Sequence, residues 1–106
     1  MTAMEKTILD RFKALLSKRM NLYKLILFGS RARGDAEPAS DMDVLVVLED
    51  MFSEKVSDFV TDCAWEAGFE SGIVIVPVVY TRSEWENSPE RYSLFALAVE
   101  KEGVLL

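Results

Sequence analysis

The sequence contains no histidine. This absence excludes catalytic triads that use an imidazole base, and it excludes metal sites with histidine ligands. Acid–base or metal chemistry must therefore rely on carboxylates. The chain has 18 aspartates and glutamates against 12 lysines and arginines, which gives a net charge of −6.

Cysteine is almost absent as well, because Cys63 is the single one. No disulfide can form within the chain, and Cys63 lies in an apolar helical pattern that predicts a buried, unreactive thiol. A chain without disulfides suits a reducing compartment, so we expect a cytoplasmic protein.

Long apolar runs are missing too. No run approaches the roughly 20 residues of a membrane-spanning helix, and residues 1–6 lack the apolar stretch of a signal peptide. We therefore expect no membrane association. A net charge of −6 also makes the chain a poor non-specific binder of phosphate backbones. A long nucleic acid is accordingly a less suitable partner than a small nucleotide or a basic protein.

What is present fits one small domain, which we expect to span residues 1–106. Apolar positions spaced by three and four predict helices, and short apolar or β-branched runs predict buried strands. The predicted order is a helix over residues 5–20, strands at Leu22–Phe28 and Asp43–Leu48, a helix between Ser53 and Gly68, and a strand at Ile73–Tyr80. A last helix follows, with Leu94, Phe95, Leu97 and Ala98 expected on its apolar, buried face. This order favours an α/β (α+β) fold, with a mixed sheet of three to four strands and helices packed on one side.

Turn and cap signals refine these predictions. Lys18 and Arg19 are expected in the last turn of the first helix and Asn21 at its left-handed stop position. Pro77 lacks an N–H for the ladder, so its strand is expected at an edge or a bulge. We expect a polar loop over residues 81–87, and Ser88–Glu90 as the start of the last helix, which Lys101 and Gly103 close. Residues 104–106 could add a short strand.

A phosphate-binding corner is predicted where the first strand ends. Gly29 allows the backbone to approach a ligand closely. Ser30 follows at a turn, which could be one helical turn, where free N–H groups and a hydroxyl suit an anion. The alternative is that Gly29-Ser30 is a turn without a binding role.

Two carboxylates lie close behind it in the sequence. Residues two apart in a strand project to the same face, so Asp41 and Asp43 should point together and Met42 into the core. Adjacent carboxylates repel unless a cation joins them, and Mg²⁺ typically combines one or two carboxylates with substrate phosphates. An Asp-x-Asp alone is common in loops. Its position at the start of a strand, close to the Gly-Ser corner, favours a function.

These residues carry a family resemblance. Gly29-Ser30-Arg31-Ala32-Arg33-Gly34, followed by Ser40-Asp41-Met42-Asp43-Val44, resembles the motif of the minimal nucleotidyltransferases in the DNA polymerase β superfamily. The resemblance implies transfer of a nucleoside monophosphate, most readily AMP from ATP, to an acceptor hydroxyl with release of pyrophosphate. Gly29 and Ser30 would hold the β- and γ-phosphates, Asp41 and Asp43 two Mg²⁺ ions, and Arg31 and Arg33 would assist the phosphates unless they are solvated loop side chains.

One feature of the family is missing. The resemblance implies a third carboxylate on a later strand, where it binds a metal and activates the acceptor hydroxyl. Residues 72–80 contain no acid, and the nearest substitutes are Glu70 and Glu84. Loss of a general base costs roughly 10²–10⁴ in rate. The sequence therefore leaves two functions open: an active transferase, and a nucleotide- and metal-binding interaction module that does not turn over.

The resemblance also implies a partner. Minimal nucleotidyltransferases commonly act beside a small helical HEPN-type protein in toxin–antitoxin pairs, so the acceptor is expected to be a protein or a small molecule. The aromatic residues Trp85, Tyr92 and Phe95 could form an interface or simply belong to the core, and a homodimer is possible. A third reading is a structural domain with a fortuitous motif.

Overall fold

The computed structural model describes residues 1–87 and 93–106. The chain forms one four-stranded sheet with strand order β3-β2-β1-β4. Strand β1 is antiparallel to both β2 and β4, whereas β3 is parallel to β2. This mixed sheet confirms the predicted fold class. The elements are α1 (Ala3–Ser17), β1 (Leu22–Phe28), α2 (Ser30–Arg33), β2 (Met42–Leu48), α3 (Glu54–Phe69), β3 (Ile75–Thr81), α4 (Arg82–Asn87), α5 (Leu94–Glu102) and β4 (Val104–Leu105).

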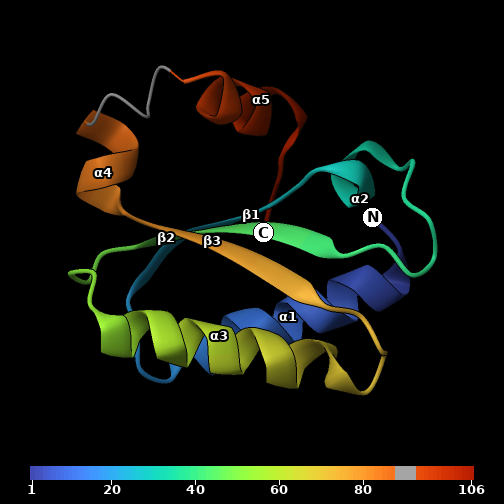
Figure 1. Cartoon of the computed structure of the whole chain (residues 1–106), viewed down its shortest axis with the longest axis horizontal. Helices are drawn as coiled ribbons and strands as arrows, with labels where there is room; N and C mark the ends of the chain where they lie inside the picture. The colour runs from blue at the N-terminus through green and yellow to red at the C-terminus, as the bar shows by residue number, and fades with distance from the viewer. Residues whose placement is uncertain (88–92) are drawn as a thin grey trace.

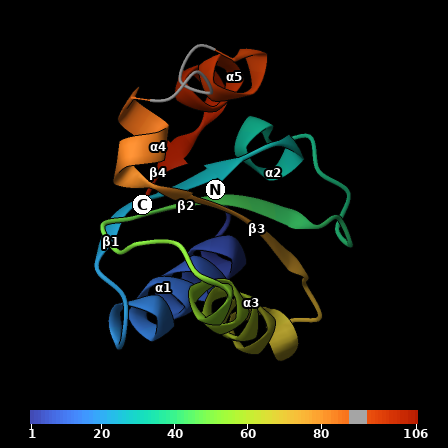
Figure 2. The same ribbon diagram turned by 60° about the vertical axis from the view of Figure 1, so that its left-hand side comes forward.

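Helices cover both faces of this sheet (Figures 1 and 2). The long helices α1 and α3 share one face, as predicted, and the short helices α2, α4 and α5 lie on the other. The expectation of helices on one side alone was therefore too simple. The physical reason is that β2 is apolar on both faces: Val44 and Val46 pack toward α1 and α3, while Leu45 and Val47 pack with Trp85 and the inner side of α5.

Helix α1 begins and ends earlier than residues 5–20. Thr2 and Glu5 form a capping box in which the Thr2 hydroxyl accepts from Glu5 N at 3.1 Å and Thr2 N donates to Glu5 Oε1 at 2.8 Å. Since α1 ends at Ser17, Lys18 is its C-cap and no basic residue lies in its last turn. Asn21 does not take a left-handed conformation, because no non-glycine residue in the described ranges has a positive φ.

Helix α3 is capped by Ser53, as predicted, whose hydroxyl accepts from Val56 N at 3.2 Å. The helix continues to Phe69, one residue past the predicted stop at Gly68. Gly68 instead permits close packing, because a Cβ there would lie 2.0 Å from the Ile73 carbonyl oxygen. Strand β3 follows at the sheet edge, which is the position that Pro77 predicted. Cys63 is buried and free, as expected.

The region predicted as a polar loop is largely helix. Residues 82–87 form α4, and Trp85 is only 3% exposed because it packs on the α5 face of the sheet, against Tyr80 at a ring-centroid distance of 5.5 Å. The predicted start of the last helix at Ser88–Glu90 lies outside the described residues. Within them, Ser93 caps α5.

The buried side of α5 differs from the prediction. Ala96 and Val99 are buried, whereas Leu94 and Leu97 are exposed. Gly103 closes this helix, and residues 104–105 add strand β4, as the sequence suggested. None of the helices in the described part of the chain combines the length and apolar composition needed to cross a bilayer.

Candidate functional site

The site is built on the turn between β1 and α2. Gly29 has φ 75° and ψ −157°, a backbone conformation that is essentially restricted to glycine. Its carbonyl oxygen accepts from Ala32 N and Arg33 N, both at 3.1 Å. The N–H groups of Ser30 and Arg31 come first in the helix and have no acceptor within it. The predicted turn is therefore present, as one turn of helix.

Asp43 lies directly beside this turn. In the β1–β2 ladder Phe28 pairs with Asp43, so the first residue after β1 meets the Asp43 side chain. A methyl group on Gly29 would be 2.5 Å from Asp43 Oδ2. Met42, between the two aspartates, is fully buried on the opposite face, as the strand alternation predicted.

The ionisation of Asp43 depends on its surroundings. Burial raises the pKa of Asp43 above its ordinary value, the negative charge of Asp41 raises it further, and Arg33 opposes both effects. The charges of Asp41 and Arg33 therefore both act on Asp43, which lies beside Gly29. A cation bound between the carboxylates would relieve this repulsion.

Two carboxylates alone make an incomplete metal site. Within the described ranges, no group of three or more aspartate, glutamate or cysteine side chains is placed to hold a metal ion. Mg²⁺ fits such a donor set, because it usually keeps several waters and takes one or two carboxylates together with phosphate oxygens. The two carboxylates therefore suit a Mg²⁺ ion whose other ligands are nucleotide phosphate oxygens and water.

Arg33 is exposed at the rim of the site. It forms ion pairs with Asp35 at 3.3 Å and with Glu102 of α5 at 3.4 Å. These hydrogen-bonded carboxylates raise the pKa of the Arg33 guanidinium. Arg33 thus keeps its charge and connects α2 to α5, and its effect on Asp43 places it near the carboxylates.

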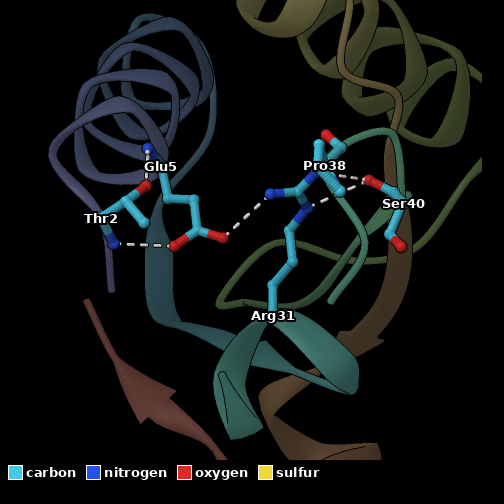
Figure 3. Close-up of polar contacts among 5 residues, drawn as sticks. All are labelled: Thr2, Glu5, Arg31, Pro38 and Ser40. Atoms are coloured by element: carbon cyan, nitrogen blue, oxygen red, sulfur yellow. Dashed lines mark hydrogen bonds and ion pairs between the residues drawn. The ribbon is translucent and has the colours of Figure 1, made fainter. Parts of the chain in front are cut away.

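Arg31 is not part of this group of side chains. It is 6% exposed and turns toward α1, where Nη1 lies 3.0 Å from Glu5 Oε2 (Figure 3). The guanidinium also donates to the carbonyl oxygens of Ser40, at 2.7 and 3.0 Å, and of Pro38, at 3.0 Å. These contacts anchor the 35–40 loop and use the Arg31 guanidinium. The placement therefore does not agree with the predicted role of Arg31 in binding phosphate.

Glu5 is the residue that the sequence analysis missed. Glu5 is 4% exposed, and it links Thr2 at the start of α1 to Arg31 in one buried network (Figure 3). Burial opposes its ionisation, but hydrogen bonds from Thr2 and the Arg31 guanidinium outweigh burial and lower the pKa of Glu5. The signal was available, because Thr2-Ala3-Met4-Glu5 is a capping-box sequence.

The residue of β3 beside Asp43 is a valine, not an acid. Val76 of β3 pairs in parallel register with Asp43, so the two side chains share a face, and Val76 is 37% exposed. Glu84 follows the far end of β3, at least five residues or about 16 Å along the strand, where it accepts from Thr81 N. Glu70 caps α3 and pairs with Arg11. Neither acid substitutes at Val76.

The C-terminal aromatic residues belong largely to the core on this face. Phe95 packs edge-on against Phe28 at 5.3 Å, and Tyr80 lies between Trp85 and Phe95. Phe28 precedes Gly29, so α5 supports the site from above the sheet. Tyr92, also named as an interface candidate, lies outside the described residues.

In sequence, the chain matches nucleotidyltransferases. The family model for the nucleotidyltransferase domain matches residues 5–100. A Methanocaldococcus jannaschii protein named "putative protein adenylyltransferase" is 36% identical over 102 residues, which cover 95% of this chain and 96% of that protein.

Solved structures agree on the fold. A toxin–antitoxin structure with AMP-PNP has a TM-score of 0.61 at 19% identity, covering 91% of this chain and 69% of that one. The MNT antitoxin complex with a tri-AMPylated HEPN toxin from Shewanella oneidensis has a TM-score of 0.55 at 16% identity, covering 96% and 70%. At these identities the likeness concerns the fold.

Proposed function

Because the chain belongs to the nucleotidyltransferase domain family, we propose that it transfers AMP from ATP to a hydroxyl group of a protein, with residues 1–106 acting as one such domain. The acceptor oxygen attacks the α-phosphorus, the bond from that phosphorus to the bridging oxygen breaks, and pyrophosphate leaves. The placement of Asp43 against Gly29 is the observation that carries the proposal, because it sets carboxylates beside backbone donors.

Each side chain has a distinct part in this scheme. Ser30, through its hydroxyl and N–H, binds the β- and γ-phosphates at the Gly29 turn. Asp41 and Asp43 would hold Mg²⁺, which would stabilise the charge that develops on the attacking and leaving oxygens. Arg33 adds a positive charge at the rim. Arg31 is a positioning residue that fixes the segment entering Asp41 through its bonds to Ser40 O.

The acceptor is proposed to be a small helical HEPN-type protein. Two facts support this choice: relatives are named as protein adenylyltransferases, and a fold relative is an antitoxin bound to an AMPylated HEPN toxin. The net charge of −6 argues against a polynucleotide acceptor. A nucleotide substrate and the single reduced thiol suit a cytoplasmic location.

The test uses purified chain, Mg²⁺, ATP labelled on the α-phosphate, and a HEPN-type protein encoded beside it. Labelled acceptor and free pyrophosphate are expected, and Asp41→Asn should abolish both. If ATP fails to bind in the presence of Mg²⁺, the proposal is wrong. Asp10→Asn, an exposed surface change, is the matched control.

A second function is favoured by one observation, the valine at position 76. Without a third carboxylate on β3 opposite Asp43, the proton of the acceptor hydroxyl passes to solvent, and transfer is correspondingly slow. The chain would then act by binding nucleotide and partner. ATP binding without any pyrophosphate release in the presence of the acceptor would favour this second function.

A further inference from the structure

An apolar groove lies between α3 and the edge strand β3, away from the nucleotide site's turn. It has a cavity volume of about 380 Å³, and side chains of Thr61, Trp65 and Phe69 line it from α3. Ile73, Val74 and Pro77 line it from the other side. We call this feature the α3–β3 groove; α3 runs below β3 in Figure 1.

The groove is unusual in how much aromatic surface it leaves in solvent. Trp65 and Phe69 are each 66% exposed, and their rings contact each other at 5.8 Å. Val74 is 50% exposed. Large exposed apolar patches mark interaction sites, and tryptophan is enriched among the residues that dominate binding energy. Trp85, in contrast, is buried, so the two tryptophans have different roles.

An acidic stripe borders the groove along α3. Asp58, Asp62, Glu66 and Glu70 recur every four residues and are all exposed. Like charges at this spacing destabilise a helix. Among the described residues, Glu70 alone of these four has an ion-pair partner, Arg11 at 3.6 Å. The stripe is therefore a negative rim whose repulsion a cationic partner would relieve.

We propose that the α3–β3 groove docks the acceptor protein of the transfer, through a segment of helix that presents apolar side chains flanked by lysine or arginine. The proposal rests on the proposed function for the identity of the acceptor. Charge complementarity selects this occupant, because a second copy of the chain would bring one acidic stripe against another under twofold symmetry.

The position of the groove explains how docking would serve the reaction. Val74 O accepts from Met42 N at 2.8 Å, between the two aspartates, and Val76 pairs with Asp43. The groove wall at Val74 is thus two residues, or about 7 Å, along the strand from the position beside Asp43. The groove lies on the α1–α3 face, whereas Asp43 is on the other face of the sheet, so a protein seated in the groove would reach the carboxylates by extending around the edge strand β3.

The test measures binding of two synthetic helical peptides to the full chain, one of leucine and lysine and one of leucine and glutamate. The lysine peptide should bind and the glutamate peptide should not. Trp65→Ser should weaken binding at least about tenfold. Glu66→Gln should weaken it about twofold to fivefold and reduce its salt dependence. Leu97→Ser on α5, with a 51% exposed leucine, is the matched control and should change nothing.

Several outcomes would overturn the proposal: no binding of the lysine peptide up to about 1 mM, equal binding of both peptides, or equal effects of Trp65→Ser and Leu97→Ser. Sedimentation showing a wild-type dimer that Trp65→Ser dissociates would identify a second copy as the occupant and also reject it. Melting curves confirm that the variants fold.

ATP binding with Mg²⁺ is measured on the same variants to separate the two proposals. Trp65→Ser should bind ATP like wild type and, when transfer is assayed, should raise the KM for the acceptor and not that for ATP. Peptide binding without ATP binding would reject the proposed function and leave the docking surface standing. The opposite result would reject the groove alone.

Discussion

The carboxylate of Asp43 lies against the Cα of Gly29, so closely that a methyl group there would be 2.5 Å from Oδ2. Phe28 and Asp43 are paired across antiparallel strands, which makes this contact a consequence of strand register. The absence of a side chain at residue 29 thus serves two purposes. It permits φ 75° and it leaves room for the carboxylate.

Gly29→Ala should therefore destabilise the protein more than Gly34→Ala. Gly34 is left-handed α, which costs alanine about 1–2 kcal/mol, and a Cβ there would meet nothing within 4 Å. The backbone of Gly29 is essentially restricted to glycine and costs alanine about 1–3 kcal/mol. Gly29→Ala adds a clash with Asp43 and should also displace that carboxylate from ATP and Mg²⁺. Urea unfolding and nucleotide titration of both variants provide the measurement. Equal losses for the two variants would contradict the contact.

Asp43→Asn should weaken binding of ATP with Mg²⁺ at least about tenfold, the lower end of what even supporting residues of metal sites cost. The ligand-free protein should keep or slightly gain stability, because the variant removes a partly buried charge that Asp41 repels. Calorimetric titration and thermal melting separate the two effects. A large loss of stability without ligand would instead assign Asp43 a structural role.

The pH at which nucleotide binding is lost on acidification should be set by the raised pKa of Asp43. Burial and Asp41 both raise it, so the metal-binding, ionised form is lost as pH falls through a midpoint above the ordinary value of about 3.9. The stability of the ligand-free protein should depend on pH in the opposite direction. Protonated Asp43 favours folding, and this contribution to the free energy of unfolding is lost as pH rises through the raised pKa. In Asp41→Asn the midpoint should move to lower pH, measured by carbon NMR of the Asp43 carboxyl group; an unchanged midpoint would refute the coupling.

Glu5→Gln should be strongly destabilising, by about 3–5 kcal/mol, because it leaves the Arg31 guanidinium buried without its counter-charge. Glu5 has a lowered pKa, so in wild type its contribution is present above the unfolded-state value and is lost as pH falls through the folded-state value. Urea unfolding at neutral and acidic pH tests both statements. Asp10→Asn breaks the exposed pair with Lys6 and, as control, should cost less than about 1 kcal/mol.

Val76→Asp should accelerate transfer, because it places a carboxylate on the same sheet face as Asp43 in the neighbouring strand. A working general base contributes about 10²–10⁴ in rate. Val76→Asn has nearly the same size without the charge and should not accelerate the reaction. Single-turnover release of pyrophosphate with the acceptor protein is the measurement. Equal rates for both variants would contradict the inference that the missing acid limits the rate of transfer.

Much of the fold follows from local patterns in the sequence. The β1 and β2 runs, the Ser53 cap and the edge position of Pro77 were all predicted, because periodicity, capping and the missing proline N–H act over a few residues. The errors occurred where burial overrode local polarity. The segment around Trp85 reads as a polar loop, yet it becomes helix α4 because the second face of the sheet needs an apolar cover.

For the site, the sequence supplies the candidate groups: a glycine–serine turn, two aspartates, no histidine, and no third acid on the later strand. The tertiary structure decided which charges are available to it. Arg31 and Arg33 are two residues apart in one motif, yet one is buried against Glu5, 26 positions earlier, and the other stands at the rim near Asp43. A long charged side chain takes the partner that folding brings within reach, and that distance is set by how α1 packs against the sheet, which no local pattern encodes.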